Sequence, residues 1–198
     1  MTTAINGLAR VITLAALLTG ATAAQAQWEL DGAGSAVNFV SIKNDSVAEL
    51  HRFASVQGSL GKDGKARLTI SLDSVETLIP IRNERMREML FETATFPTAT
   101  ASATVAPELV ASLAGAGTMV TDLTFTLALH GVEKAFTVPV VITGAANGGF
   151  QLFTPAPVIV NAADFGLEAG VAALQSVAGL KAISAAVPVT VHLVFKPL

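Results

Sequence analysis

The sequence predicts an all-β protein built as an antiparallel eight-stranded barrel with one or two short helices. Apolar and polar residues alternate through most of the chain after residue 26, which is typical of strands with one buried face. Clusters of turn-forming residues at 61–64 and 145–149 separate these runs. Hydrophobic residues make up 52% of the chain and charged residues 14%, against roughly 25% charged in soluble domains. The apolar excess is compatible with a lined cavity.

The first element, residues 1–26, is expected to be a cleavable signal peptide. Arg10 is followed by the apolar run Val11–Leu18, and Ala24-Gln25-Ala26 is a pattern that signal peptidase can cleave before Gln27. A membrane anchor is the weaker alternative, because the apolar run is shorter than the roughly 20 residues that span a bilayer. The chain has no cysteine, so it cannot carry a lipidated N-terminal cysteine. We expect residues 27–198 to be one soluble domain in the periplasm, with no integral membrane span.

The strongest strand signal lies at residues 119–130, where Leu123, Phe125 and Leu127 share one face. The next residues, 131–134, are expected to form a turn that joins this strand to a second alternating run in a hairpin. The other alternating runs are 35–43, 67–72, 136–142 and 187–195. About eight strands are expected, and an eight-stranded barrel has an interior just wide enough for one slender ligand.

Two segments change from strand to helix periodicity. Residues 82–91 place Met86, Met89 and Leu90 at helical spacing with charged residues between them. Residues 168–177 show a similar pattern after Gly166. We expect both segments to be short helices.

The charge balance argues against a nucleic-acid partner. Without residues 1–26 the chain has 11 basic and 15 acidic residues, a formal charge of −4. A protein that binds a phosphate backbone needs clustered Lys and Arg, and the basic residues here are scattered except at Arg82, Arg85 and Arg87. That cluster has two interpretations. It either binds an anionic head group, with Arg82 as the best candidate, or forms a solvated helix face neutralised by neighbouring glutamates.

The sequence offers little catalytic chemistry. No Gly-x-Ser-x-Gly elbow, cysteine nucleophile or phosphate-binding glycine loop is present. His51, His130 and His192 have no further ligand at metal-binding spacing, so they are expected on solvent faces or at strand ends. His51 and His130 are also placed at the barrel rims, where they could contact a head group. We therefore expect no catalytic residues, no cofactor and no enzyme.

The apolar strand faces either fill a core or line a tube, and the sequence alone leaves both interpretations open. The residues we expect to line a tube are Val37, Phe39, Phe53 and Ile70. The wider set with the same ambiguity comprises Phe125, Leu127, Phe136, Phe153 and Phe195.

A series of short segments, in this order and spacing, resembles the YceI-like family across nearly the whole chain after residue 26. The segments are Ser35-Ala36-Val37-Asn38-Phe39, His51-Arg52-Phe53, Val56-Gln57-Gly58-Ser59-Leu60, Leu72-Asp73-Ser74-Val75-Glu76-Thr77, Ile81-Arg82-Asn83-Glu84-Arg85-Met86-Arg87, Leu90-Phe91-Glu92, Phe96-Pro97-Thr98-Ala99, Leu129-His130-Gly131-Val132-Glu133-Lys134 and Asp164-Phe165-Gly166. The chain departs from the family pattern at Asn83, where Asp is frequent, and at Glu133, where Thr is frequent. It also has Asn161-Ala162-Ala163 where an Arg is common, which puts one head-group contact in doubt.

The resemblance implies a lipocalin-like barrel in an exported protein that binds polyisoprenoid lipids. The implied partner is an amphiphilic lipid with a long isoprenoid chain, such as a polyisoprenoid or a quinone, which the barrel stores or transports without catalysis. An enzyme acting on such a lipid, with His51 or His130 as base, is one alternative. A stress-related exported protein with a filled barrel that acts through protein partners is another. The oligomeric state is left open, a homodimer included.

Overall fold

A computed structural model describes residues 26–113 and 117–198. The predicted signal peptide lies outside the described residues except for Ala26. The strands are β1 (Ala26–Leu30), β2 (Ala36–Lys43), β3 (Val47–Phe53), β4 (Val56–Gly61), β5 (Lys65–Ser71), β6 (Val75–Glu76), β7 (Thr98–Thr104), β8 (Thr118–Leu129), β9 (Val132–Gly144), β10 (Phe150–Phe153), β11 (Val158–Asn161) and β12 (Ala186–Pro197). The helices are α1 (Pro80–Arg85), α2 (Pro107–Ser112) and α3 (Glu168–Val177), with short helical turns η1 (Leu72–Ser74), η2 (Met86–Leu90) and η3 (Ala162–Phe165).

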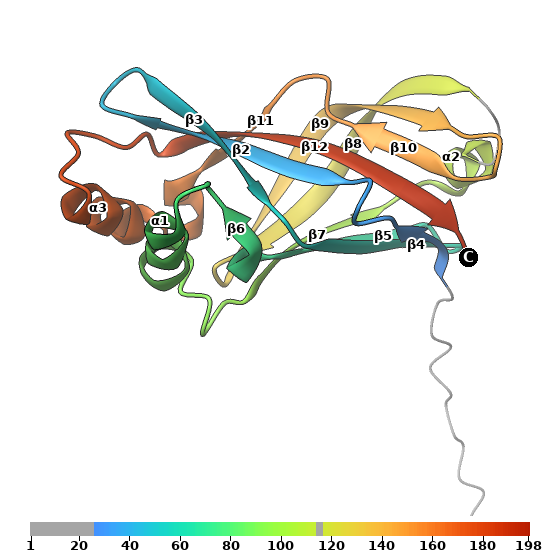
Figure 1. The fold of residues 1–198 in the computed structure, drawn as a ribbon. Helices are drawn as coiled ribbons and strands as arrows, with labels where there is room; N and C mark the ends of the chain where they lie inside the picture. Colours follow the sequence, from blue (N-terminus) through green and yellow to red (C-terminus); the bar gives the residue numbers. More distant parts are fainter. Residues whose placement is uncertain (1–25, 114–116) are drawn as a thin grey trace, which may run out of the picture.

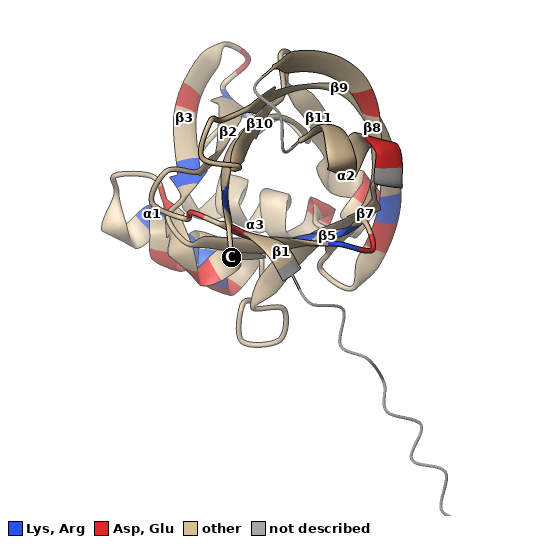
Figure 2. Cartoon of the chain, turned by 90° about the vertical axis from the view of Figure 1, so that its right-hand side faces the viewer, with Lys and Arg blue, Asp and Glu red and all other residues tan. Residues whose placement is uncertain are grey.

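The strands form a closed antiparallel barrel. Neighbouring strands follow the order β1-β4-β5-β7-β8-β9-β10-β12, and β12 pairs back with β1 to close a ring of eight. Figure 2 shows the ring viewed along the axis of the barrel. The long strand β12 pairs with β10 and β1 through its C-terminal half and with β11 and β2 through its N-terminal half. The predicted all-β, eight-stranded barrel is confirmed.

The helices lie at opposite ends of the barrel (Figure 1). At one end η2, which continues α1, packs against α3, beside the part of the wall formed by β2, β3 and β6. At the other end lies α2, which the sequence analysis did not predict. Gly170 of α3 allows the close helix contact, because a Cβ there would lie 2.6 Å from the carbonyl oxygen of Met89. The predicted helix 168–177 has the expected bounds, and the predicted helix 82–91 starts two residues earlier, at Pro80.

The turn predicted at residues 131–134 is shorter in the structure. His130 and Gly131 alone form it, with φ angles of 51° and 78°, and β9 already starts at Val132. Two consecutive residues with positive φ are the geometry of a two-residue hairpin turn whose twist matches that of the strands. Glycine tolerates this region at no steric cost, which explains Gly131.

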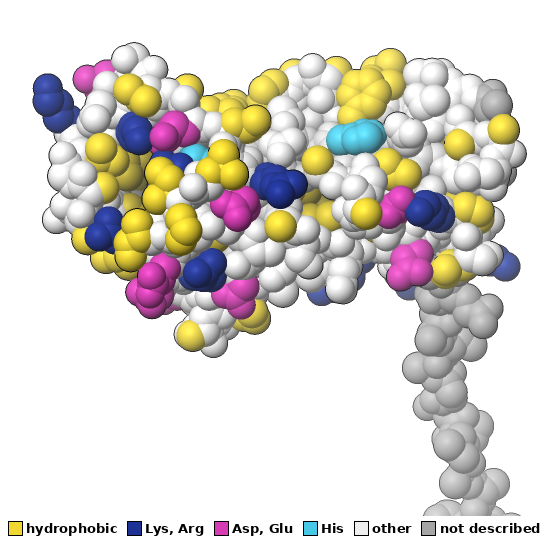
Figure 3. Space-filling view, viewed as in Figure 1, with side chains coloured by type: hydrophobic (Ala, Val, Ile, Leu, Met, Phe, Trp, Pro, Cys, Tyr) yellow, Lys and Arg dark blue, Asp and Glu magenta, His cyan; other side chains and the backbone are white. Residues whose placement is uncertain are grey.

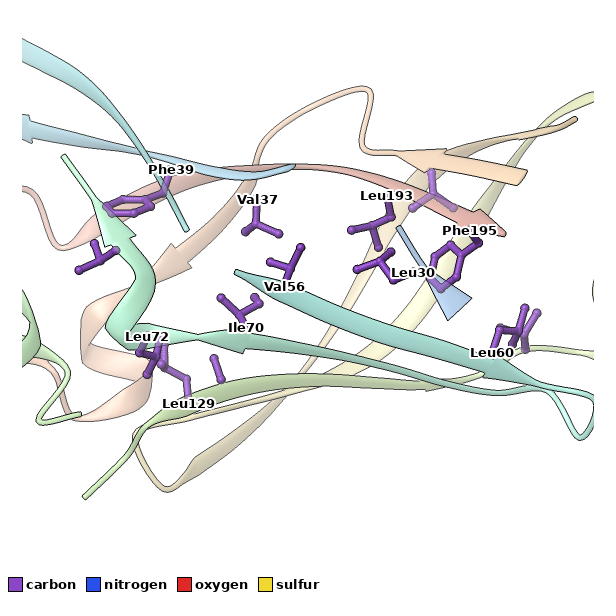
Figure 4. Packing of buried hydrophobic residues seen from close by; sticks show 14 of the residues in the cluster. Leu30, Val37, Phe39, Val56, Leu60, Ile70, Leu72, Leu129, Leu193 and Phe195 are labelled. Atoms are coloured by element: carbon purple, nitrogen blue, oxygen red, sulfur yellow. The ribbon is translucent and has the colours of Figure 1, made fainter. Parts of the chain in front are cut away.

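The alternating residues face the barrel interior as predicted. Figure 4 shows Val37, Val56 and Leu193 pointing into the space between the walls. The buried set also includes Leu30, Leu60, Ile70, Leu72, Leu129, Val140, Ile142 and Phe195. The interior is therefore lined mostly by apolar side chains.

Candidate functional site: a cavity inside the barrel

The barrel encloses a cavity of about 560 Å³. This volume lies within the range of about 300–1,000 Å³ that is usual for small-molecule sites. Its wall is mostly apolar and draws on strands from all sides of the ring, with Leu68, Leu127, Val140, Leu152 and Leu193 among the lining residues. The cavity can hold an elongated apolar molecule.

All four residues predicted to line a tube lie in the cavity wall: Val37, Phe39, Phe53 and Ile70. The rings of Phe39 and Phe53 have centroids 5.2 Å apart, and Phe53 in turn lies 5.8 Å from Phe91. These aromatic rings form a continuous apolar surface on the side of β2 and β3.

Only part of the wider predicted set lines the cavity. Phe125, Leu127 and Phe195 line the cavity. Phe136 instead stacks between Phe125 and Phe165, with centroid distances of 5.6 and 6.5 Å. Phe153 is 38% exposed, so the prediction that it shares the inner apolar face is wrong. It follows Leu152, which takes the inward position in β10, and therefore points to the outer face.

One end of the cavity is closed by packed side chains next to α2. Trp28 donates a hydrogen bond from Nε1 to the carbonyl oxygen of Gly148, at 2.8 Å, and contacts Phe150 edge to face. Phe150 stacks on Phe195 with centroids 4.7 Å apart. Leu113 of the α2 segment is also buried. A ligand chain would end against this cluster.

The opposite end carries the opening. Among the large apolar residues of the cavity wall, three are exposed to solvent: Ile79, Ile81 and Val177. They belong to the start of α1 and the end of α3. The mouth therefore lies between these two helices and the β2–β3 hairpin. Figure 3 shows hydrophobic side chains at this end of the molecule with charged side chains of both signs among them.

A charged cluster borders the mouth. Oε2 of Glu49 lies 2.8 Å from Nζ of Lys43 and 2.7 Å from Nη1 of Arg82. Arg82 also donates from Nη2 to the carbonyl oxygen of Thr77, at 2.7 Å. The hydrogen bond from Lys43 and the charges of Arg82 and Lys43 lower the pKa of Glu49. Glu49 is therefore an anion that links β3 to α1.

The three arginines have different environments. Arg82 is held by Glu49, so the interpretation of the cluster as a wholly solvated helix face is wrong for this residue. Arg85 lines the cavity. Arg87 lies on the outside, 3.4 Å from the carbonyl oxygen of Asp73. The three guanidinium groups therefore do not converge on one anion.

His51 differs most from its prediction. Its side chain lies in the middle of β3, is only 4% exposed and lines the cavity, so the expectation of a solvent face or strand end is wrong. Nε2 of His51 lies 2.8 Å from Oγ of Ser41. Burial, followed by the positive charge of Arg82, lowers the pKa of His51 below its ordinary value of 6.5. His51 is therefore neutral at pH 7. Its spacing of two residues from Phe53 was the sequence signal for an inward position.

The other two histidines do not line the cavity. His130 lies in the β8–β9 turn, with Nε2 3.8 Å from Oε2 of Glu92, and His192 is exposed on the outer wall, 3.1 Å from Oε1 of Gln151. Their expected places at a strand end and on a solvent face are confirmed. No cluster of three or more metal-binding side chains occurs in residues 26–113 and 117–198.

A buried polar network next to the mouth was missed by the sequence analysis. Oδ1 of Asn83 accepts hydrogen bonds from the backbone N–H and the hydroxyl of Thr77, at 2.9 and 2.6 Å. Nδ2 of Asn83 donates to Glu76, and the same Glu76 oxygen accepts from the backbone N–H of Leu78. The network fixes the segment that leads into α1.

Residues 28–195 match the family model of the YceI-like domain. The chain belongs to the YceI-like family. A polyisoprenoid binding domain from Saccharophagus degradans, implicated in plant cell wall breakdown, is 38% identical, with a TM-score of 0.84 over 88% of this chain and 100% of that one. Burkholderia cenocepacia BcnA is 22% identical, with a TM-score of 0.64 over 83% of this chain and 98% of that one, and has the same fold. No curated protein matches the sequence significantly. In the described part of this YceI-like chain, no helix has the length and hydropathy to cross a membrane.

Proposed function

We propose that the barrel binds an amphiphilic lipid with a long isoprenoid-type chain, of the polyisoprenoid or quinone type, and stores or transports it without catalysis. The observation that carries the proposal is the 560 Å³ apolar cavity, in which four of the five charged lining residues, Lys43, Glu49, Arg82 and Arg85, lie at one mouth. The 38% identical relative, named as a polyisoprenoid binding domain, supports the same ligand class.

The geometry gives the ligand a direction. Its apolar chain lies along Val37, Phe39, Phe53 and Ile70 towards the aromatic cluster beside α2, and its polar end stays at the mouth near His51. Burial of several hundred Å² of chain provides up to about 10 kcal/mol before the entropy costs of binding. Specificity comes from the length of the cavity and from the few polar groups at its mouth.

The proposal includes export to the periplasm, with residues 1–26 removed and residues 27–198 forming the lipid-binding barrel. Cleavage before Gln27 retains Trp28, whose buried side chain belongs to the closed end of the barrel. A soluble carrier is useful in an aqueous compartment, because an isoprenoid chain does not cross water unaided. The intact mass of protein from a periplasmic extract tests the cleavage site.

Native mass spectrometry combined with lipid extraction tests the binding function. Protein expressed with its own N-terminal segment should carry a lipid, and delipidated protein should take one up. Ala101→Phe should reduce this lipid content at least roughly tenfold, because Ala101 lines the cavity and the ring occupies ligand space. Thr104→Phe on the same strand is the matched control, since Thr104 is exposed. Absence of lipid from the wild-type protein, in both experiments, would refute the proposal.

One contact favours a second candidate, an enzyme that hydrolyses an ester of such a lipid. Ser41 and the neutral His51 form a hydrogen-bonded pair inside the cavity, as a nucleophile and its base do. Among the described residues, however, Nδ1 of His51 has no partner that would orient the ring. Turnover of lipid esters that disappears in both Ser41→Ala and His51→Ala would establish the enzyme. Equal turnover in the wild type and both variants would exclude this enzyme activity.

A further inference from the structure

The cavity mouth is surrounded by exposed apolar side chains, which we call the mouth rim. The rim consists of Val47 on the β2–β3 hairpin, Leu78, Ile79 and Ile81 around the start of α1, and Val177 at the end of α3. Val47 lies two residues from Glu49 on the same face of β3, and Glu49 binds Arg82 of α1. The hairpin and α1 therefore lie side by side at the mouth, where Figure 3 shows the hydrophobic side chains.

Leu78 is the most exposed member of the rim, at 87%. Its φ angle is +64°, a left-handed conformation that disfavours residues with a Cβ. The conformation is maintained by the network of Asn83, because Leu78 donates to Glu76 and the preceding Thr77 donates to Asn83. Leu78 belongs neither to the wall of the barrel cavity nor to the hydrophobic core. The fold thus holds a large apolar side chain outward in a strained conformation, which is a feature of functional sites.

The rim is continuous with the cavity wall. Ile79, Ile81 and Val177 are exposed and also line the cavity, so an apolar path runs from the interior to the outer surface. A long-chain lipid that leaves the cavity here meets apolar side chains as far as the rim. The phase that receives such a lipid without contact with water is a lipid bilayer.

The charges near the rim nearly balance, with four basic and three acidic side chains. Lys43 and Arg82 both bind Glu49, and on α1–η2 the arginines Arg85 and Arg87 lie between Glu84 and Glu88. A surface of this kind approaches a bilayer mainly through apolar insertion, with a small contribution from anionic lipids.

We propose that the mouth rim docks on a lipid bilayer, with Leu78 as the leading anchor, so that cargo passes between bilayer and cavity without entering water. The proposal rests on the lipid-binding function proposed above. It adds the partner surface from which the barrel is loaded and to which it delivers.

Flotation with phosphatidylcholine vesicles, with and without phosphatidylglycerol, tests the docking. Wild-type protein should float with both vesicle types, and Leu78→Gly should bind roughly tenfold more weakly, the effect of one Leu side chain that no longer inserts. Glycine suits the positive φ, and Leu78 is outside the cavity wall, so this variant keeps both fold and cargo. Val120→Ser is the matched control. Val120 is 70% exposed and lies near the start of β8. Ten residues, or roughly 33 Å of strand, separate Val120 from the β8–β9 turn at His130.

Each result has a separate meaning. Wild-type protein that does not float, or Leu78→Gly and Val120→Ser variants that float equally well, would overturn the docking. A dimer that Leu78→Gly disrupts, without flotation of the wild type, would assign the rim to a second copy of the chain instead. Native mass spectrometry of the same samples isolates the cause: retained lipid without flotation refutes the docking alone, whereas wild-type protein that neither carries nor takes up lipid refutes the binding function.

Discussion

The two ends of the barrel are built on opposite principles. Beside α2 the interior is filled by aromatic rings, with Phe150 in contact with both Trp28 and Phe195 and the indole N–H satisfied by Gly148. At the mouth, polar groups such as His51 are buried and large apolar groups such as Leu78 are exposed. The first arrangement lowers the free energy of the fold. The second costs free energy at each of these positions.

This difference separates stability from function within one sheet. The long strands β8, β9 and β12 run from the closed end towards the mouth, so the packed end can support a mouth that is locally unfavourable. Substitutions at the closed end should therefore act on the free energy of unfolding. Substitutions at the mouth should act on ligand exchange, docking and pH dependence.

The largest effect is expected for Trp28→Ala at the closed end. Loss of a buried Trp side chain should lower the free energy of unfolding by about 3–5 kcal/mol. Chemical denaturation measures it, with Ile81→Ala at the mouth as the comparison, because Ile81 is half exposed and should cost less than about 1 kcal/mol. Equal losses in the two variants would contradict the division between the ends.

A smaller effect is expected for Asn83→Ala in the network beside the mouth. The change leaves the N–H and hydroxyl of Thr77 without their shared acceptor, which should cost about 1–3 kcal/mol. Hydrogen exchange should accelerate at Thr77 and Leu78, while the amides of β12 remain protected. Glu84→Ala, the exposed neighbour on α1, is the control and should change stability by less than about 0.5 kcal/mol. Unchanged exchange at Leu78 in Asn83→Ala would show that the network does not hold the rim.

The fold could be predicted from the sequence because a barrel wall repeats one simple signal. Alternation places Leu123, Phe125 and Leu127 on the inner face of β8 whatever the neighbouring strands are, and the same reasoning identified Val37 and Phe39. It failed at Phe153, because the four-residue strand β10 gives too few alternations to fix which face is buried.

The mouth could not be predicted in the same way, because its features depend on contacts between distant segments. Arg82 differs from a solvated helix residue because it binds Glu49, which lies 33 residues earlier in the chain. The positive φ of Leu78 arises from the Asn83 network and has no local glycine signal. His51 was assigned by residue type to a solvent face, although its two-residue spacing from Phe53 favoured an inward one. At functional positions, residue type and position in the fold conflict, and residue type alone then misleads.

The smallest effect concerns the pH dependence that His51 confers on the mouth. Because burial and Arg82 lower the pKa of His51 in the folded protein, the unfolded chain binds more protons as the pH falls through 6.5. His51 therefore lowers the free energy of unfolding progressively as the pH falls below 6.5, and this loss is small at pH 7. Glu49 acts in a separate window, since its lowered pKa gives a contribution that is lost only below its ordinary value of 4.5. Denaturation between pH 7 and pH 5 should thus show a smaller loss of stability in His51→Gln than in the wild type. The control is His192→Gln, which leaves His51 in place and should show the same loss as the wild type. Equal losses in wild type and His51→Gln would mean that the mouth readily accommodates a protonated His51, and that the polar group facing the cargo is charged in acidic surroundings.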